Sequence, residues 1–202
     1  MRKLLILMAF VFSFTEIHSQ EIYLQTGKNF TSYNYKSDVA TTPDLQAGSG
    51  NFYEIGYLTP LTEKLNYAVG LGLNEYNAIG GNAANSYSWN TQYLGVQNTF
   101  SIAFIKSGGF ETSANVGLGI NTLIYGKQNI NGHYLDLSSQ KEFSGLWLAP
   151  KLGLQASYNV DNDIFLSLGY GYSKSFNLTN STPEKLSFNN NQIQFGVHFI
   201  FR

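Results

Sequence analysis

The last ten residues, IQFGVHFIFR (193–202), decide the fold class of this chain. The large apolar residues take every second position: Ile193, Phe195, Val197, Phe199 and Phe201. Successive side chains of a β-strand point to opposite faces, so a strand here gathers these groups on one face and places Gln194, Gly196 and His198 on the other. Whether that apolar face meets a protein interior or lipid determines the architecture of the whole chain.

The same alternation recurs along the sequence and predicts eight strands in total. Five further segments alternate as clearly as the last one: 65–74, 94–104, 113–121, 148–157 and 164–173, with Asn98 as the one polar residue in the apolar register of its segment. Two segments give weaker signals. Residues 51–59 place Tyr53 and Ile55 opposite Phe52 and Glu54, whereas residues 23–35 predict a strand without a clean assignment of faces. An even number of strands allows an antiparallel sheet to close into a barrel.

The predicted connections between strands alternate in length. Three are short and rich in turn-forming residues: 59–64, 106–109 and 159–163. Four are longer and rich in Asn, Ser, Thr and Gly: those near 37–49, 80–86, 126–142 and 176–187. This alternation predicts an up-and-down barrel with both chain termini on the side of the short connections.

The composition of the polar faces indicates which face meets lipid. Charged residues make up only 12% of the chain, against roughly a quarter in ordinary soluble domains. The polar faces carry Gly, Ser, Asn and Gln, which suit the crowded lumen of an eight-stranded barrel better than a water-exposed surface. Aromatic residues near the ends of the predicted strands are expected to form girdles on the lipid-facing surface: Tyr57, Trp89, Tyr93, Tyr158, Tyr172 and Phe201. We therefore predict an all-β chain that forms an eight-stranded antiparallel up-and-down transmembrane β-barrel. A secreted soluble barrel that binds an apolar ligand is the alternative.

The N-terminal segment has the layout of a secretory signal peptide. Arg2 and Lys3 precede the apolar run 4–14, and Ser19 is small enough to precede a cleavage site. We predict a signal peptide over 1–19 and a barrel domain over 20–202, with a buried N-terminal helix as the alternative. Removal of residues 1–19 leaves ten basic and twelve acidic side chains (12 − 2 and 13 − 1), a formal charge of −2, so no basic surface favours nucleic acid.

Together these features resemble a known family. The predicted signal peptide, the eight alternating segments, the phrases YAVGLGLNE (67–75) and ANVGLGINT (114–122), and the aromatic-rich final strand are similar to small outer-membrane β-barrel proteins of Gram-negative bacteria, the OmpA-like and OmpX-like group. Arg202 departs from the family pattern, in which the last residue is commonly aromatic. The resemblance implies insertion into outer-membrane lipid, long connections that face outward, and no shared chemistry.

Three charged residues are candidates for a polar network inside the barrel. Glu54 and Lys151 both lie on the small-residue face near mid-depth, and an unpaired charge in a narrow lumen costs several kcal/mol. We expect a structural salt bridge between them that plugs the lumen, with a role in transport or proton relay as the alternative. Glu111 faces inward nearer the short connections and is a candidate third member.

Two histidines remain after the predicted cleavage, and they bear on enzymatic function. His198 faces inward, and His133 lies in the connection 126–142. A lipid-modifying hydrolase would need Ser, His and a carboxylate at a lipid-accessible rim, so neither position favours one. The chain has no Cys, and two isolated histidines make a poor metal site. We expect no enzymatic activity, cofactor or metal.

The expected role is therefore that of a scaffold. A filled barrel would hold its surface connections, notably 37–49 and 126–142, for adhesion, envelope interaction or complex assembly with extracellular or envelope proteins. A small channel is the first alternative and a lipid-modifying hydrolase the second.

Overall fold

The structure is a computed structural model, and it describes residues 20–36, 45–81, 86–179 and 185–201. The predicted signal peptide (1–19), most of the connection 37–49 and Arg202 lie outside the described residues. The strands are β1 (Gln20–Lys36), β2 (Leu45–Pro60), β3 (Leu65–Glu75), β4 (Ala78–Gly81), β5 (Ser86–Ser107), β6 (Phe110–Ile130), β7 (His133–Asp136), β8 (Leu146–Asp161), β9 (Ile164–Asn177) and β10 (Lys185–Phe201). In these ranges no helix has the length and apolar character needed to cross a membrane.

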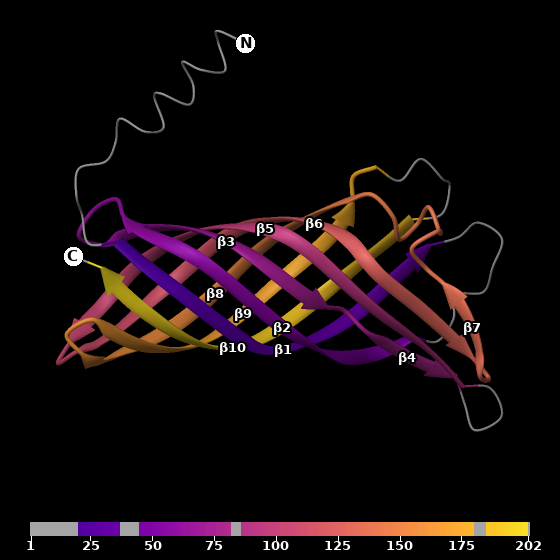
Figure 1. The fold of residues 1–202 in the computed structure, drawn as a ribbon, viewed down its shortest axis with the longest axis horizontal. Coiled ribbons are helices and arrows are strands. Elements are labelled where there is room, and N and C mark those ends of the chain that lie inside the picture. The colour runs from indigo at the N-terminus through magenta and orange to yellow at the C-terminus, as the bar shows by residue number, and fades with distance from the viewer. Residues whose placement is uncertain (1–19, 37–44, 82–85, 180–184, 202) are drawn as a thin grey trace, which may run out of the picture.

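The strands close into one antiparallel ring (Figure 1). β1 pairs with β2 on one side and with β10 on the other, where the register runs from Gln20 opposite Phe201 to Lys36 opposite Lys185. β3 and β4 together count as one strand of the barrel, because both pair with β2 on one side and with β5 on the other. β7 pairs with β6 alone and forms a hairpin with it, beyond the part of β6 that pairs with β8. The predicted eight-stranded up-and-down barrel is confirmed.

The two ends of the barrel differ as the link lengths predict. Residues 61–64, 108–109 and 162–163 make the three tight connections at one end, which we call the short-link end, and both described chain ends lie there (Figure 1). At this end the Ile200 N–H donates to Asp163 O at 2.9 Å, so the last strand is tied to a tight turn. The opposite, long-link end carries β4, β7 and the residues between β7 and β8 (Figure 1).

The final strand has its apolar face on the outside. Ile193, Phe195 and Phe201 are exposed, whereas Gly196 and His198 are buried in the lumen. The same holds for β2, where Tyr53 and Ile55 point outward and Phe52 and Glu54 inward. The exposed large hydrophobic side chains of the strands thus form a belt around the barrel, as a transmembrane barrel requires.

Polar residues within this belt have partners on neighbouring strands. Asn98, the interruption in the apolar register, accepts a hydrogen bond from the Tyr67 hydroxyl on β3 at 2.6 Å. Tyr170 donates in the same way to Asn191 at 2.6 Å. Such pairs reduce the free-energy cost of exposing a polar group to lipid, because its hydrogen bond is made with a side chain of the neighbouring strand.

β5 and β6 are longer than the sequence pattern predicts. They contain 22 and 21 residues, whereas roughly 9–11 residues suffice for a strand to cross a bilayer. Their regular alternation breaks at a bulge, where the register passes from Tyr93–Leu123 to Gln92–Tyr125 and leaves Ile124 without a partner position. β3 and β4 are separated where the Asn77 side chain takes the place of ladder bonds: its amide donates to Ser49 O at 2.9 Å and its Oδ1 accepts from the Thr91 N–H at 3.1 Å.

Candidate functional site

The inward face of β1 orders the lumen into four layers from the short-link end. Glu21, Tyr23, Asn29 and Tyr33 are four of the inward-facing residues of this strand, in order from the short-link end, and each marks one group of side chains. These groups are a hydrogen-bonded histidine, a charged pair, an amide cluster and an aromatic cluster.

The charged pair lies in the second layer and contains two of the predicted site residues. Glu54 on β2 is 6% exposed, and its Oε2 lies 4.0 Å from Nζ of Lys151 on β8. The Tyr23 hydroxyl donates to Glu54 Oε1 at 2.6 Å. Gly70 provides the space for this contact, because a Cβ at this position would lie 2.6 Å from both Glu54 Oε1 and the Tyr23 hydroxyl oxygen. The narrow lumen therefore brings Glu54 and Lys151 together across the barrel.

Glu111 does not join this pair. Its Oε2 lies 2.9 Å from Lys106 Nζ across the β5–β6 hairpin, at the short-link end. Both side chains are partly exposed there, so the third predicted residue belongs to an ion pair at the rim of the lumen and not to the network of Glu54 and Lys151.

The third layer is a cluster of amides around the fully buried side chain of Asn29. Its Nδ2 donates to Asn74 Oδ1 at 3.2 Å, and its Oδ1 accepts from Asn190 Nδ2 at 2.9 Å and Gln192 Nε2 at 3.0 Å. These bonds connect β1, β3 and β10 through the lumen. Because each amide both donates and accepts, this layer satisfies buried polar groups without charge.

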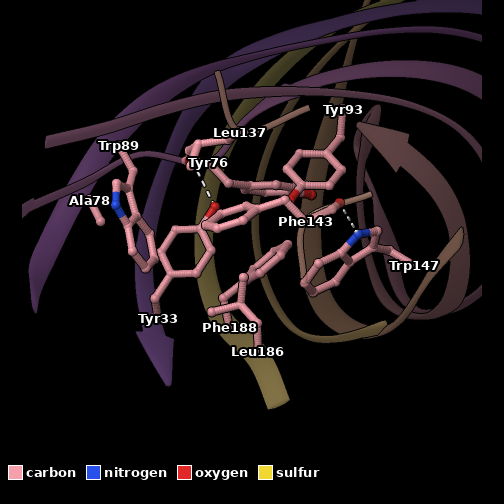
Figure 2. Packing of buried hydrophobic residues seen from close by; sticks show 10 residues of the cluster. All are labelled: Tyr33, Tyr76, Ala78, Trp89, Tyr93, Leu137, Phe143, Trp147, Leu186 and Phe188. Carbon is pink, nitrogen blue, oxygen red and sulfur yellow. Dashed lines mark hydrogen bonds between the residues drawn. The ribbon is translucent and has the colours of Figure 1, made fainter. Parts of the chain in front are cut away.

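The fourth layer closes the long-link end with an aromatic plug, which Figure 2 shows. We define the aromatic plug as the buried cluster Tyr33, Tyr76, Ala78, Trp89, Tyr93, Leu137, Phe143, Trp147, Leu186 and Phe188. Phe143 packs edge-on against Trp89, with ring centroids 5.0 Å apart. The Trp147 indole N–H donates to Phe143 O at 2.9 Å. Leu137 and Phe143 come from the segment between β7 and β8, which therefore folds into the barrel mouth.

The aromatic plug corrects part of the prediction for the lipid-facing girdle. Tyr158, Tyr172 and Phe201 are exposed as predicted, but Trp89 and Tyr93 are buried in the lumen. Their odd positions on β5 share the inward parity of Gln97, opposite to Leu94 and Val96. An aromatic residue near a strand end suggests a lipid-facing girdle, but the alternation of faces along β5 decides the direction of these two side chains.

The first layer, at the short-link end, surrounds His198 on β10. Its Nδ1 is hydrogen-bonded to Glu21 Oε1 on β1, and its Nε2 lies 2.8 Å from the Ser167 hydroxyl oxygen on β9. The Tyr23 ring stacks on the imidazole with centroids 5.7 Å apart. His198 points inward as expected, and His133 is exposed on β7. The sequence gives no sign that Ser167 and Glu21 meet His198, because the three residues lie on three different strands.

Small cavities separate these layers. One of about 50 Å³ is lined by Glu54, Lys151 and His198, among others, and one of about 20 Å³ lies between the charged pair and Tyr76. A third, of about 190 Å³, is lined by Glu21, Glu111 and His198 near the short-link end. In the described part of the chain, no group of three or more His, Cys, Asp or Glu side chains is arranged to hold a metal.

The closed ring, the apolar outer belt and the unequal ends define a small β-barrel of the outer-membrane type. No protein-family model and no curated protein sequence matches the chain. Solved structures do match its fold. The crystal structure of neisserial surface protein A aligns with a TM-score of 0.53 at 14% identity, over 89% of this chain and 97% of that protein.

Two further barrels show the same similarity. A major outer membrane protein from Thermus thermophilus aligns with a TM-score of 0.53 at 13% identity, over 91% of this chain and all of that protein. The outer membrane protein OprG from Pseudomonas aeruginosa aligns with a TM-score of 0.52 at 11% identity, over 91% of this chain and 97% of that protein. The predicted resemblance to small outer-membrane β-barrel proteins is therefore confirmed for the fold.

Proposed function

We propose that this chain is an integral outer-membrane protein of a Gram-negative cell, with a closed lumen, that serves as a rigid mount for its surface segments. The aromatic plug is the observation that carries this proposal. A channel needs a continuous wet path, and eight strands leave little room for one even before the lumen is filled. In this barrel an aromatic layer, an amide layer and a charged pair are stacked along the axis of the lumen and fill it.

The exposed hairpin of β6 and β7 supports a role in binding partners. Lys127 Nζ lies 3.7 Å from the centre of the Tyr134 ring, and Leu135 beside it is exposed. The segment that follows is fixed to the barrel, because the Asn177 amide donates to Glu142 O at 3.1 Å and Ser144 O at 2.8 Å. A fixed support with exposed aromatic and charged tips suits recognition of an extracellular or envelope protein.

Two measurements test this proposal. Cell fractionation should find the protein with the outer membrane, and its gel mobility should change on boiling, as a folded barrel requires. Recovery of the folded chain in a detergent-free soluble fraction would contradict the proposed location. Reconstitution in planar bilayers should then give no steady conductance, with the heat-dependent mobility shift of the same sample as the control for folding. Steady single-channel currents would favour the small-channel alternative and overturn the closed lumen.

A further inference from the structure

We propose that Ser167 is an activated nucleophile at the short-link end of the lumen, with His198 as its general base and Glu21 as the residue that positions the base. The site would accept small carboxylic esters that reach the lumen from the short-link side. This proposal goes beyond the scaffold role and departs from the expectation that the chain has no enzymatic activity.

The hydrogen bonds define the direction of proton transfer. A carboxylate oxygen accepts hydrogen bonds, so we assign the N–H of His198 Nδ1 as the donor to Glu21 Oε1. In the neutral imidazole the other nitrogen, Nε2, is then free to accept from the Ser167 hydroxyl at 2.8 Å. A nucleophile bonded to a base, and a base oriented by a third group, is the arrangement that activates a serine.

The imidazole is held in place on several sides. Tyr23 stacks on one face of the ring at 5.7 Å, while Glu21 and Ser167 hold its two nitrogens. Gly196 leaves the space in which the hydroxyl meets the ring. A Cβ at this position would lie 2.5 Å from the Ser167 hydroxyl oxygen and 3.1 Å from His198 Nε2.

Two amide side chains line the cavity beside His198. Gln25 and Gln194 line the same cavity of about 50 Å³ as His198. The Gln25 Cγ lies 3.0 Å from the Cβ position of residue 196, next to the Ser167 hydroxyl. Side-chain amide N–H groups can stabilise the negative charge that develops on an attacked carbonyl oxygen.

The size of the site limits the substrate. His198 also lines the cavity of about 190 Å³ at the short-link end, and the aromatic plug closes the opposite mouth. Ser167 is only 4% exposed and lines neither cavity, so only a small acyl group, such as acetyl, would reach it past His198. Because Ser167 faces the lumen, the acyl chains of membrane lipids around the barrel are not its substrates.

The reaction would proceed in two balanced steps. The Ser167 hydroxyl oxygen bonds to the ester carbonyl carbon as its proton passes to His198 Nε2. The ester C–O bond then breaks, and the leaving alcohol takes that proton. Water attacks the acyl-serine by the same route, which releases the carboxylic acid and restores the hydroxyl.

The test uses the full-length folded protein in detergent with 4-nitrophenyl acetate. We expect release of 4-nitrophenol together with one acetyl group on Ser167, located by peptide mass spectrometry. Ser167→Ala should abolish this modification, and His198→Gln should slow acetylation by about 100-fold or more, the typical contribution of a general base. Gly196→Ala should also slow it, because the added methyl group displaces the hydroxyl from the ring.

Controls separate activation from structure. Ser175→Ala is the matched control, because Ser175 is a fully buried serine on the same strand, opposite Phe188 of the aromatic plug, and its loss should leave acetylation of Ser167 unchanged. Glu21→Gln should lower the maximal rate of acetylation with little change in the half-saturating ester concentration, as expected for a positioning residue. The heat-dependent mobility shift confirms folding of each variant.

Three results would overturn the proposal. They are a folded wild-type protein that is not acetylated at Ser167, equal acetylation after heat unfolding, and undiminished acetylation of a folded His198→Gln variant. None of them bears on the scaffold role, which the conductance and fractionation measurements address separately.

Discussion

Glu54 shows how single residues make a charged group tolerable inside a narrow barrel. The carboxylate is buried, and it is supported by the Tyr23 hydroxyl at 2.6 Å and by the Lys151 ammonium at 4.0 Å. Gly70 keeps the space that lets the carboxylate and the hydroxyl meet. The pair is therefore a structural unit whose parts depend on one another, since removal of Lys151 leaves the buried Glu54 carboxylate without an opposite charge.

Lys151→Met should destabilise the barrel. Breaking a fully buried ion pair costs about 3–5 kcal/mol, and we expect about 2–4 kcal/mol because the Lys151 side chain retains 23% exposure. Urea unfolding in lipid vesicles measures the change. Lys106→Met is the matched control: Lys106 pairs with Glu111 at the rim of the lumen, where both side chains are partly exposed, and such pairs contribute about 0–1 kcal/mol. Equal effects of the two substitutions would refute a structural role for the lumen pair.

Asp136 offers a residue-level test of the β7 region outside the membrane. The Ser138 hydroxyl donates to its carboxylate at 2.7 Å, and the Ser138 backbone N–H at 2.8 Å. These bonds, the hydroxyl first, lower the pKa of Asp136 below its ordinary value. Because the folded-state pKa is lowered, the interaction is present at neutral pH and is lost as the pH falls through that pKa.

Ser138→Ala should therefore raise the pKa of Asp136 towards its ordinary value, as measured by carboxyl ¹³C NMR titration. Ser139→Ala is the control, because the Ser139 hydroxyl donates to the backbone oxygen of Asp136 and not to its carboxylate. An equal shift in both variants would show that the Ser138 hydroxyl is not the cause.

At the level of elements, β6 tests which face of the wall meets lipid. Val116 points outward and is 53% exposed near the middle of the apolar belt, and Thr122 lies on the same face six residues nearer the long-link end. An arginine on the lipid face costs about 2–4 kcal/mol at the bilayer midplane and about 0–1 kcal/mol near the interfaces. Val116→Arg should thus lower the free energy of unfolding in vesicles clearly, and Thr122→Arg should lower it little. A larger loss of unfolding free energy for Thr122→Arg than for Val116→Arg would mean that the bilayer midplane lies nearer Thr122.

The extent to which the sequence predicts an element depends on how cleanly its two faces differ. In β10, apolar and small polar residues alternate strictly, so both strand and orientation follow from the sequence. In β1, Thr26 and Lys28 lie on the outward face and Tyr23 and Tyr33 on the inward face, so the faces could not be assigned although the strand is regular. Parity, however, places Tyr93 inward, and only the expectation of an aromatic girdle placed it outside.

Contacts between distant segments follow less well from the sequence. Glu54 and Lys151 meet because a closed barrel brings inward residues at equal depth together, and the strand count predicts this. The aromatic plug depends on Leu137 and Phe143, which lie in an irregular segment that has no periodicity to indicate burial. The contacts of His198 with Ser167 and Glu21 depend on register, which the alternation pattern leaves open.

The whole molecule has two chemically different ends. The long-link end is closed by the aromatic plug, whereas the short-link end carries the cavity of about 190 Å³ and the His198 contacts. Outer-membrane barrels have short turns on the periplasmic side and long loops on the outside. This orientation would turn the plug towards the cell exterior and the proposed reactive serine towards the periplasm, so that each end meets a different compartment.

Cysteine labelling of intact cells tests that orientation directly, because the chain contains no Cys. Glu63 is exposed in the tight connection between β2 and β3 at the short-link end, and His133 is exposed at the start of β7 at the long-link end. A membrane-impermeant maleimide should modify His133→Cys on intact cells and should modify Glu63→Cys only after the outer membrane is opened. Because each variant carries one thiol on the same barrel, reactivity after lysis serves as the control for thiol accessibility. Labelling of Glu63→Cys alone on intact cells would show the opposite orientation in the membrane, with the aromatic plug at the periplasmic face.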